Sequence, residues 1–169
     1  MKTIRFFISI LFLLLVVAII GNIVMSTIGL FFNHDVFNTG IYSNNEVSLN
    51  IKVIFIFKVI ALLMFIFGVY VLISKLKFLV RRDFFNLILI HCFSKSGKLF
   101  LVSGIIGFTA SIFDILNLAV VKDFGSQAYL NMDSKSLYIM LMILGLFLIL
   151  FSKVLNKGNQ IQQENDLTI

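Results

Sequence analysis

Two ionisable residues stand inside long apolar stretches, where charged side chains are rare. Lys58 lies six residues after Lys52, and Asp114 lies eight residues before Lys122, with Asn117 three residues beyond Asp114. A charge held inside a bilayer costs about 3 kcal/mol or more, so such residues mark ion paths, proton relays or buried pairs. These three polar residues are therefore the first candidates for a functional site.

The spacing of the two charges places them at similar depths. At 1.5 Å per residue, Lys58 lies about 9 Å inward of Lys52 and Asp114 about 12 Å inward of Lys122. We expect an ion pair between neighbouring antiparallel helices. Two alternatives stay open: Lys58 extends outward to the headgroups while Asp114 faces water or bonds Asn117, or the pair serves transport or proton transfer.

Other chemistry-bearing residues form weaker patterns. His91 and Cys92 are adjacent, about 100° apart on a helix, and would need ligands from elsewhere to bind a metal. A single cysteine excludes an internal disulfide. Since no phosphate-binding, zinc or nucleophile motif is present in the sequence, we expect no catalytic site, no metal and no cofactor.

The composition requires lipid as part of the solvent. Hydrophobic residues make up 60% of the 169 residues and charged residues 13%, against about 45–50% and about 25% in soluble domains. We expect an all-α integral membrane four-helix bundle forming one domain. The net charge of +6 fits contact with anionic headgroups, so the bilayer is the expected partner, without direct binding of nucleic acid.

Four apolar runs are long enough to cross a bilayer about 30 Å thick. They cover residues 6–32, 53–73, 99–121 and 136–155. The first is longer than the roughly 7–15 apolar residues of a signal peptide, which favours a retained signal anchor over a cleaved one.

The basic residues predict the orientation. Ten of the 14 lysines and arginines precede the first run, lie between residues 74 and 98, or follow residue 152. Such a bias marks the cytoplasmic side. We expect a multi-pass protein of the bacterial inner (cytoplasmic) membrane, with its N- and C-termini in the cytoplasm.

The segment between the second and third runs is apolar in part. Residues 83–93 read DFFNLILIHCF, which is too short to cross and too apolar for water. Basic residues flank it, as in helices that lie at a membrane surface, so a short interfacial helix is expected. The alternative is an extension of the second or third run.

Small and polar residues share one face of the third run. They fall within an arc of about 140° at 3.6 residues per turn: Ser103, Gly104, Gly107, Ala110, Ser111, Asp114 and Asn117. Small residues let helices approach closely in lipid, so we expect this face to pack inside the bundle, with a polar cavity as the alternative. The first run carries a weaker version: Ala18, Gly21, Asn22, Ser26 and Gly29.

The closing segment turns polar and then ends apolar. Gly158 is expected to break the last helix, leaving a cytoplasmic tail at residues 156–169 that is either frayed or a docking peptide. The candidate partner-contact residues are Gln163, Glu164, Asn165, Asp166, Leu167, Thr168 and Ile169.

The tail, KGNQIQQENDLTI, resembles the closing motif of a bacterial family of small four-span membrane proteins known as domain of unknown function 2975. The paired aromatics followed by an asparagine near residue 84, and the glycine before the third run, are similar to the family's middle segment. The resemblance implies no catalytic residues. It implies a membrane-linked regulatory role, with a cytoplasmic partner such as a helix-turn-helix regulator.

Two functions follow from these patterns. The first is a non-enzymatic regulatory or sensing protein that binds a partner through the tail. The alternative is a small transporter or channel subunit that uses Lys58, Asp114 and Asn117. The sequence does not predict an oligomeric state.

Overall fold

The chain forms four long antiparallel helices, each apolar enough to cross a bilayer. The computed structural model describes residues 2–32, 49–75, 86–121 and 132–166. The helices are α1 (Lys2–Phe32), α2 (Leu49–Ser74), α4 (Leu87–Val121) and α5 (Met132–Asp166). Backbone groups in hydrocarbon can be satisfied only within helices or closed barrels, so these apolar runs fold as helices. The protein is an all-α, multi-pass membrane protein, as its composition predicts.

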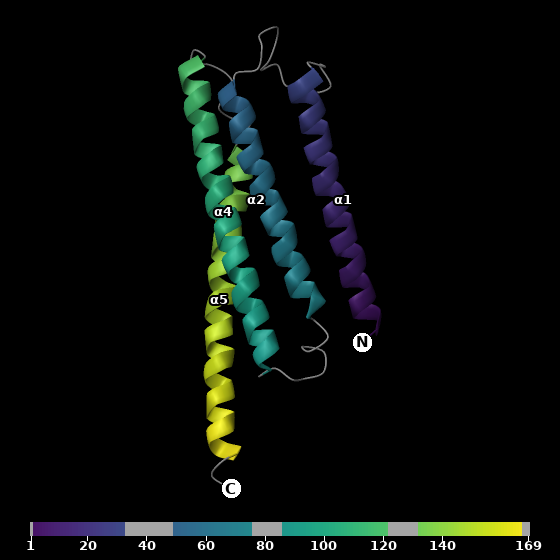
Figure 1. The fold of residues 1–169 in the computed structure, drawn as a ribbon, viewed down its shortest axis with the longest axis vertical. Coiled ribbons are helices and arrows are strands. Elements are labelled where there is room, and N and C mark those ends of the chain that lie inside the picture. The colour runs from purple at the N-terminus through teal and green to yellow at the C-terminus, as the bar shows by residue number, and fades with distance from the viewer. Residues whose placement is uncertain (1, 33–48, 76–85, 122–131, 167–169) are drawn as a thin grey trace.

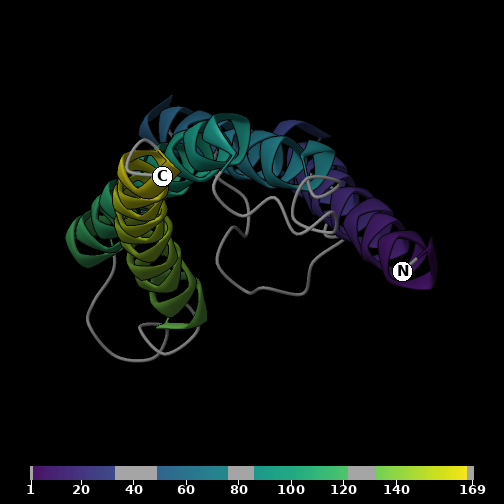
Figure 2. The same ribbon diagram turned by 90° about the horizontal axis from the view of Figure 1, so that it is seen from below.

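The helices pack in chain order as an open, curved row, which Figure 2 shows from below. Helix α4 packs extensively against both α2 and α5, while α1 contacts α2 more sparsely. The ring of Phe12 on α1 lies 6.4 Å from that of Tyr70 on α2. Along the helix axes, the first turn of α1 and the last turn of α5 lie at the same end of the molecule (Figure 1). Helix α4 is therefore the centre of the packed part.

The structure corrects the separate interfacial helix predicted for residues 83–93. Residues 87–93 are the first two turns of α4, which continues unbroken to Val121; residues 83–85 lie outside the described part. Asn86 starts the helix, because its Oδ1 accepts a hydrogen bond from the amide of Ile88 at 2.9 Å. Leu89 and Ile90 are buried, so packing against neighbouring helices holds this apolar segment. For residues 87–93 the alternative prediction, an extension of the third run, is therefore correct.

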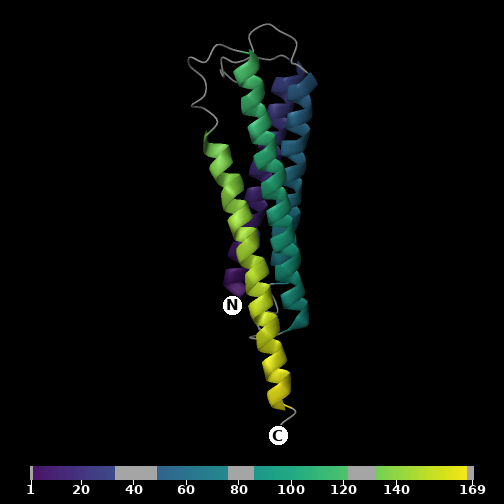
Figure 3. The ribbon, with the colours of Figure 1, turned by 90° about the vertical axis from the view of Figure 1, so that its left-hand side faces the viewer.

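The last helix also runs further than predicted. Gly158 does not end α5, which continues eight residues beyond it to Asp166. A glycine inside a helix costs about 1 kcal/mol relative to alanine, and glutamines favourable to helices follow it. Figures 1 and 3 show that the end of α5 projects past the ends of the other three helices.

Candidate functional site at the α2–α4 interface

Side chains of α4 bond to backbone carbonyls of α2 along most of their contact. The hydroxyl of Ser103, which is fully buried, donates to the carbonyl of Ala61 at 2.7 Å. The hydroxyl of Ser96 donates to the carbonyl of Gly68 at 3.1 Å. Each carbonyl belongs to a residue with a small side chain or none, so the backbones of the two helices approach closely. These bonds fix the register, with Ser103 level with Ala61 and Ser96 level with Gly68.

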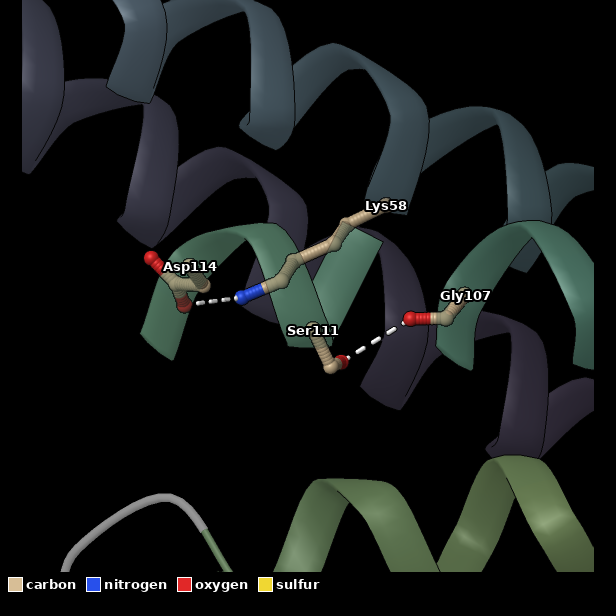
Figure 4. A network of polar contacts seen from close by, with 4 residues as sticks. All are labelled: Lys58, Gly107, Ser111 and Asp114. Atoms are coloured by element: carbon tan, nitrogen blue, oxygen red, sulfur yellow. Dashed lines mark hydrogen bonds and ion pairs between the residues drawn. The ribbon is translucent and has the colours of Figure 1, made fainter. Parts of the chain in front are cut away.

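At the far end of this interface Lys58 and Asp114 form an ion pair. The Nζ of Lys58 lies 2.6 Å from Oδ2 of Asp114, and the two side chains are 25% and 17% exposed. Figure 4 shows the lysine extended along the interface towards the carboxylate. The pairing that the sequence left open is therefore formed.

The backbones of the pair are not at the same depth. By the register of Ser103 with Ala61, Lys58 lies level with Ile106, eight residues before Asp114, or about 12 Å along the axis. The similar depths expected from the sequence are thus wrong for the two backbones. The expectation assumed that Lys52 and Lys122 mark one level, whereas α4 reaches further than α2 at that end (Figure 1).

The pair bridges this offset because the two helices run antiparallel. Side chains on a helix lean towards its N-terminus. Lys58 on α2 therefore leans towards the Leu49 end, and Asp114 on α4 leans the opposite way, back towards Lys58. The lysine extends outward, as the alternative interpretation supposed, but it ends on a carboxylate. The long side chain of Lys58 covers most of the offset, so the short side chain of Asp114 is sufficient to complete the pair.

The neighbouring polar group does not join the pair. Ser111, one turn before Asp114, donates its hydroxyl to the carbonyl of Gly107 at 2.9 Å (Figure 4). Asn117 lies three residues after Asp114 on α4, and its side chain is outside the part that the structure describes. The site that can be built is an ammonium and a carboxylate, with no further titratable partner among the described contacts.

The small-residue face of α4 is packed, as predicted. Ser103, Gly104, Gly107, Ala110 and Ser111 are all buried. The face serves two neighbours, because Ser103 bonds to α2 whereas Gly104 and Gly107 face α5. A methyl group added at Gly104 would lie 2.9 Å from the carbonyl oxygen of Tyr138 on α5. Such close approach supports plain packing over a polar cavity.

Helices α4 and α5 also approach closely at Gly97 and Gly145, for which the sequence predicted no packing role. A methyl group at Gly97 would lie 2.7 Å from the carbonyl oxygen of Gly145, and one at Gly145 would lie 2.7 Å from that of Gly97. On α2, a methyl at Gly68 would lie 2.6 Å from the ring of Phe100. The seven-residue spacing of Gly97 and Gly104 was the signal that could have found the α5 contact.

The weaker small-residue face predicted for α1 is not packed. Ala18, Gly21, Asn22 and Ser26 are exposed, and a methyl at Gly21 would meet nothing within 4 Å. Gly29 is outside the described side chains. None of the described side chains of α1 is buried. Small residues permit close approach, but they do not by themselves select a neighbour within the chain.

The remaining candidates do not assemble into a site. Cys92 is buried and donates its thiol to the carbonyl of Val71 at 3.1 Å, while His91 is exposed beside it. Among the described residues, no group of three or more histidine, cysteine or acidic side chains could hold a metal.

The predicted contact residues of the tail lie at the other end of the molecule from the ion pair. Gln163, Glu164 and Asn165 are exposed on the last turns of α5. Asp166 is the last residue of that helix, and its side chain is not among those described. Leu167, Thr168 and Ile169 lie outside the described residues.

Comparisons with protein-family models, curated proteins and solved structures gave no match. The resemblance of the tail to the four-span family therefore stays a prediction. What the fold and the site define is a multi-pass helical membrane protein with an ion pair between two of its spanning helices.

Proposed function

We propose that this is a non-enzymatic membrane protein that presents the end of α5 to a soluble partner. The observation that carries the proposal is the projection of α5 beyond the other helices (Figure 3). Its last eight residues continue the helix after Gly158. A membrane protein needs no such extension to span, because about 20 residues suffice.

The projecting helix offers an amphipathic docking element. Ile161 is 51% exposed, surrounded by the polar side chains of Gln160, Gln162 and Gln163. An exposed apolar side chain on a polar helix suits insertion into a partner's groove. The bias of basic residues supports a cytoplasmic location for this end, where a regulator of the helix-turn-helix type would meet it in a bacterial cell.

The test is deletion of residues 159–169 in the full chain, read by affinity capture from membranes of the source cell. We expect insertion to be unchanged and one soluble protein to be lost. Ile161→Glu should lose the same protein, whereas the control Gln160→Glu, which adds the same charge on another face of the helix, should keep it. An identical set of captured proteins for all variants would contradict the proposal.

A second candidate is a small transporter or channel subunit that uses the intramembrane pair. The partial exposure of Lys58 and Asp114 favours it, because a permeant ion or proton must reach such a pair. Asp114→Asn should then change flux or proton uptake in vesicles. If that variant lowers only the yield and stability of the protein, the pair is a structural link between α2 and α4.

A further inference from the structure

The outward face of α4 carries a positively charged stripe. His91, Lys95 and Lys98 are all exposed and follow one another at intervals of four and three residues, which places them on one side of the helix. The buried residues that face α2 and α5 lie on the other sides. The exposed apolar residues Val102 and Ile105 continue the same outward face, so the stripe borders lipid.

The lysines of the stripe lie level with the apolar runs of α2 and α5. Ser96 bonds to Gly68 of α2, and Gly97 packs on Gly145 of α5. Both of these partner glycines stand inside apolar runs. The sequence alone had assigned residues 95 and 98 to a cytoplasmic segment, and the packing of α4 revises that assignment.

The nearby membrane boundary is marked by both neighbouring helices. Ser152 of α5 donates to the carbonyl of Ile90 at 2.9 Å, and Lys153 follows it. Helix α2 ends at Ser74, before Lys75. The apolar runs of both neighbours thus end within about one turn of the level of Ile90. Lys95 and Lys98 lie five and eight residues further in, at about 8 and 12 Å.

No carboxylate of the surrounding helices offsets these charges. Residues 49–75, 86–113 and 134–163 contain no aspartate or glutamate. The side chains lean towards the N-terminus of α4 and hence towards the headgroups, but Lys98 can cover only part of its depth. A negative group drawn inward from the leaflet would compensate the charges that no carboxylate of these stretches offsets.

The beginning of α4 adds to the attraction for an anion. The helix starts next to the stripe, capped by Asn86, and the aligned peptide dipoles give this end of the helix a partial positive charge. The stripe borders the exposed apolar side chains of Val102 and Ile105, along which acyl chains would lie. A lipid fits this combination better than a soluble peptide or nucleic acid.

We propose that His91, Lys95 and Lys98 form a binding site for the headgroup of an anionic phospholipid in the leaflet at the Leu87 end of α4. The two lysines bind the phosphate and draw the headgroup below its usual level. His91 lies at the entrance. The acyl chains run along the face that carries Val102 and Ile105.

The test compares lipid binding by two double variants of the full chain in mixed micelles, measured by native mass spectrometry. One is Lys95→Gln with Lys98→Gln. The matched control is Lys153→Gln with Lys157→Gln, which removes two exposed lysines of α5 at the same end of the molecule. The probes are phosphatidylglycerol, phosphatidylcholine and inorganic phosphate.

We expect the wild type to prefer phosphatidylglycerol over phosphatidylcholine. In the α4 variant, which combines Lys95→Gln with Lys98→Gln, the ratio of the two affinities should fall about fivefold for each lysine removed. The control should keep the preference, and Lys95→Arg with Lys98→Arg should restore it. An equal loss in the control would overturn the site in favour of general surface charge. Retention of the preference in the α4 variant, or equal binding of inorganic phosphate, would also overturn it.

Discussion

The ammonium of Lys58 and the carboxylate of Asp114 lie 2.6 Å apart, although their backbones are offset by about eight residues along the α2–α4 interface. The antiparallel directions of the helices make this contact geometrically natural, because each side chain leans towards the other. The pair lies at one end of the α2–α4 interface, and further along it Ser96 and Ser103 donate hydrogen bonds to carbonyls of α2.

The offset predicts that the length of the cation matters as much as its charge. Lys58→Arg should keep most of the stability, because arginine also reaches Asp114 and remains charged. Lys58→His should lower the unfolding free energy by about 2–3 kcal/mol, since the shorter ring leaves the carboxylate without its partner. Unfolding in mixed micelles by increasing SDS measures both. Equal losses for the two variants would contradict the geometry.

The close contact of α4 with α5 predicts a large effect of one methyl group. Gly97→Ala and Gly145→Ala should each lower stability by about 1–3 kcal/mol, because the added carbon meets a backbone carbonyl that cannot move aside. The matched control is Gly21→Ala on α1, where a methyl meets nothing within 4 Å. Its thermal midpoint should be unchanged or slightly higher. A similar loss at all three glycines would contradict the packing.

The interhelical hydrogen bonds predict a smaller effect. Ser103→Ala removes the donor to Ala61 while leaving the buried volume nearly unchanged, and it should cost about 0.6–1.7 kcal/mol. Thr109→Ala is the control, because the hydroxyl of Thr109 is exposed and bonds only carbonyls of its own helix. The same SDS titration measures both variants. A greater loss at Thr109 would count against the assigned contact.

The number of helices and the pairing of charges could be predicted from the sequence because both follow from the cost of polar groups in lipid. Apolar runs of about 20 residues allow only spanning helices. A lysine and an acid in neighbouring runs reduce each other's cost by pairing. The small-residue face of α4 was predicted for the same kind of reason, since close approach in lipid depends on side-chain size.

The starts and ends of helices could not be predicted because they depend on neighbours. The segment before Lys98 was assigned to the cytoplasm by its charges, yet burial of Leu89 and Ile90 joins it to α4. Gly158 was expected to end α5, but propensity is a weak guide to a single position. The depth offset of Lys58 and Asp114 depends on the register of α2 against α4, which the bonds of Ser96 and Ser103 set and which the pattern of neither helix alone specifies.

The most direct test of the central claim, that the ion pair links α2 to α4, is a double-mutant cycle with Lys58→Met and Asp114→Asn. Stability is measured by SDS titration in mixed micelles for the wild type, both single variants and the double variant. If the ion pair links the two helices, the coupling energy is at least about 1 kcal/mol, and the double variant is more stable than the sum of the two single losses would give. Losses that add to within about 0.5 kcal/mol would show that the two residues do not interact, and would contradict the claim.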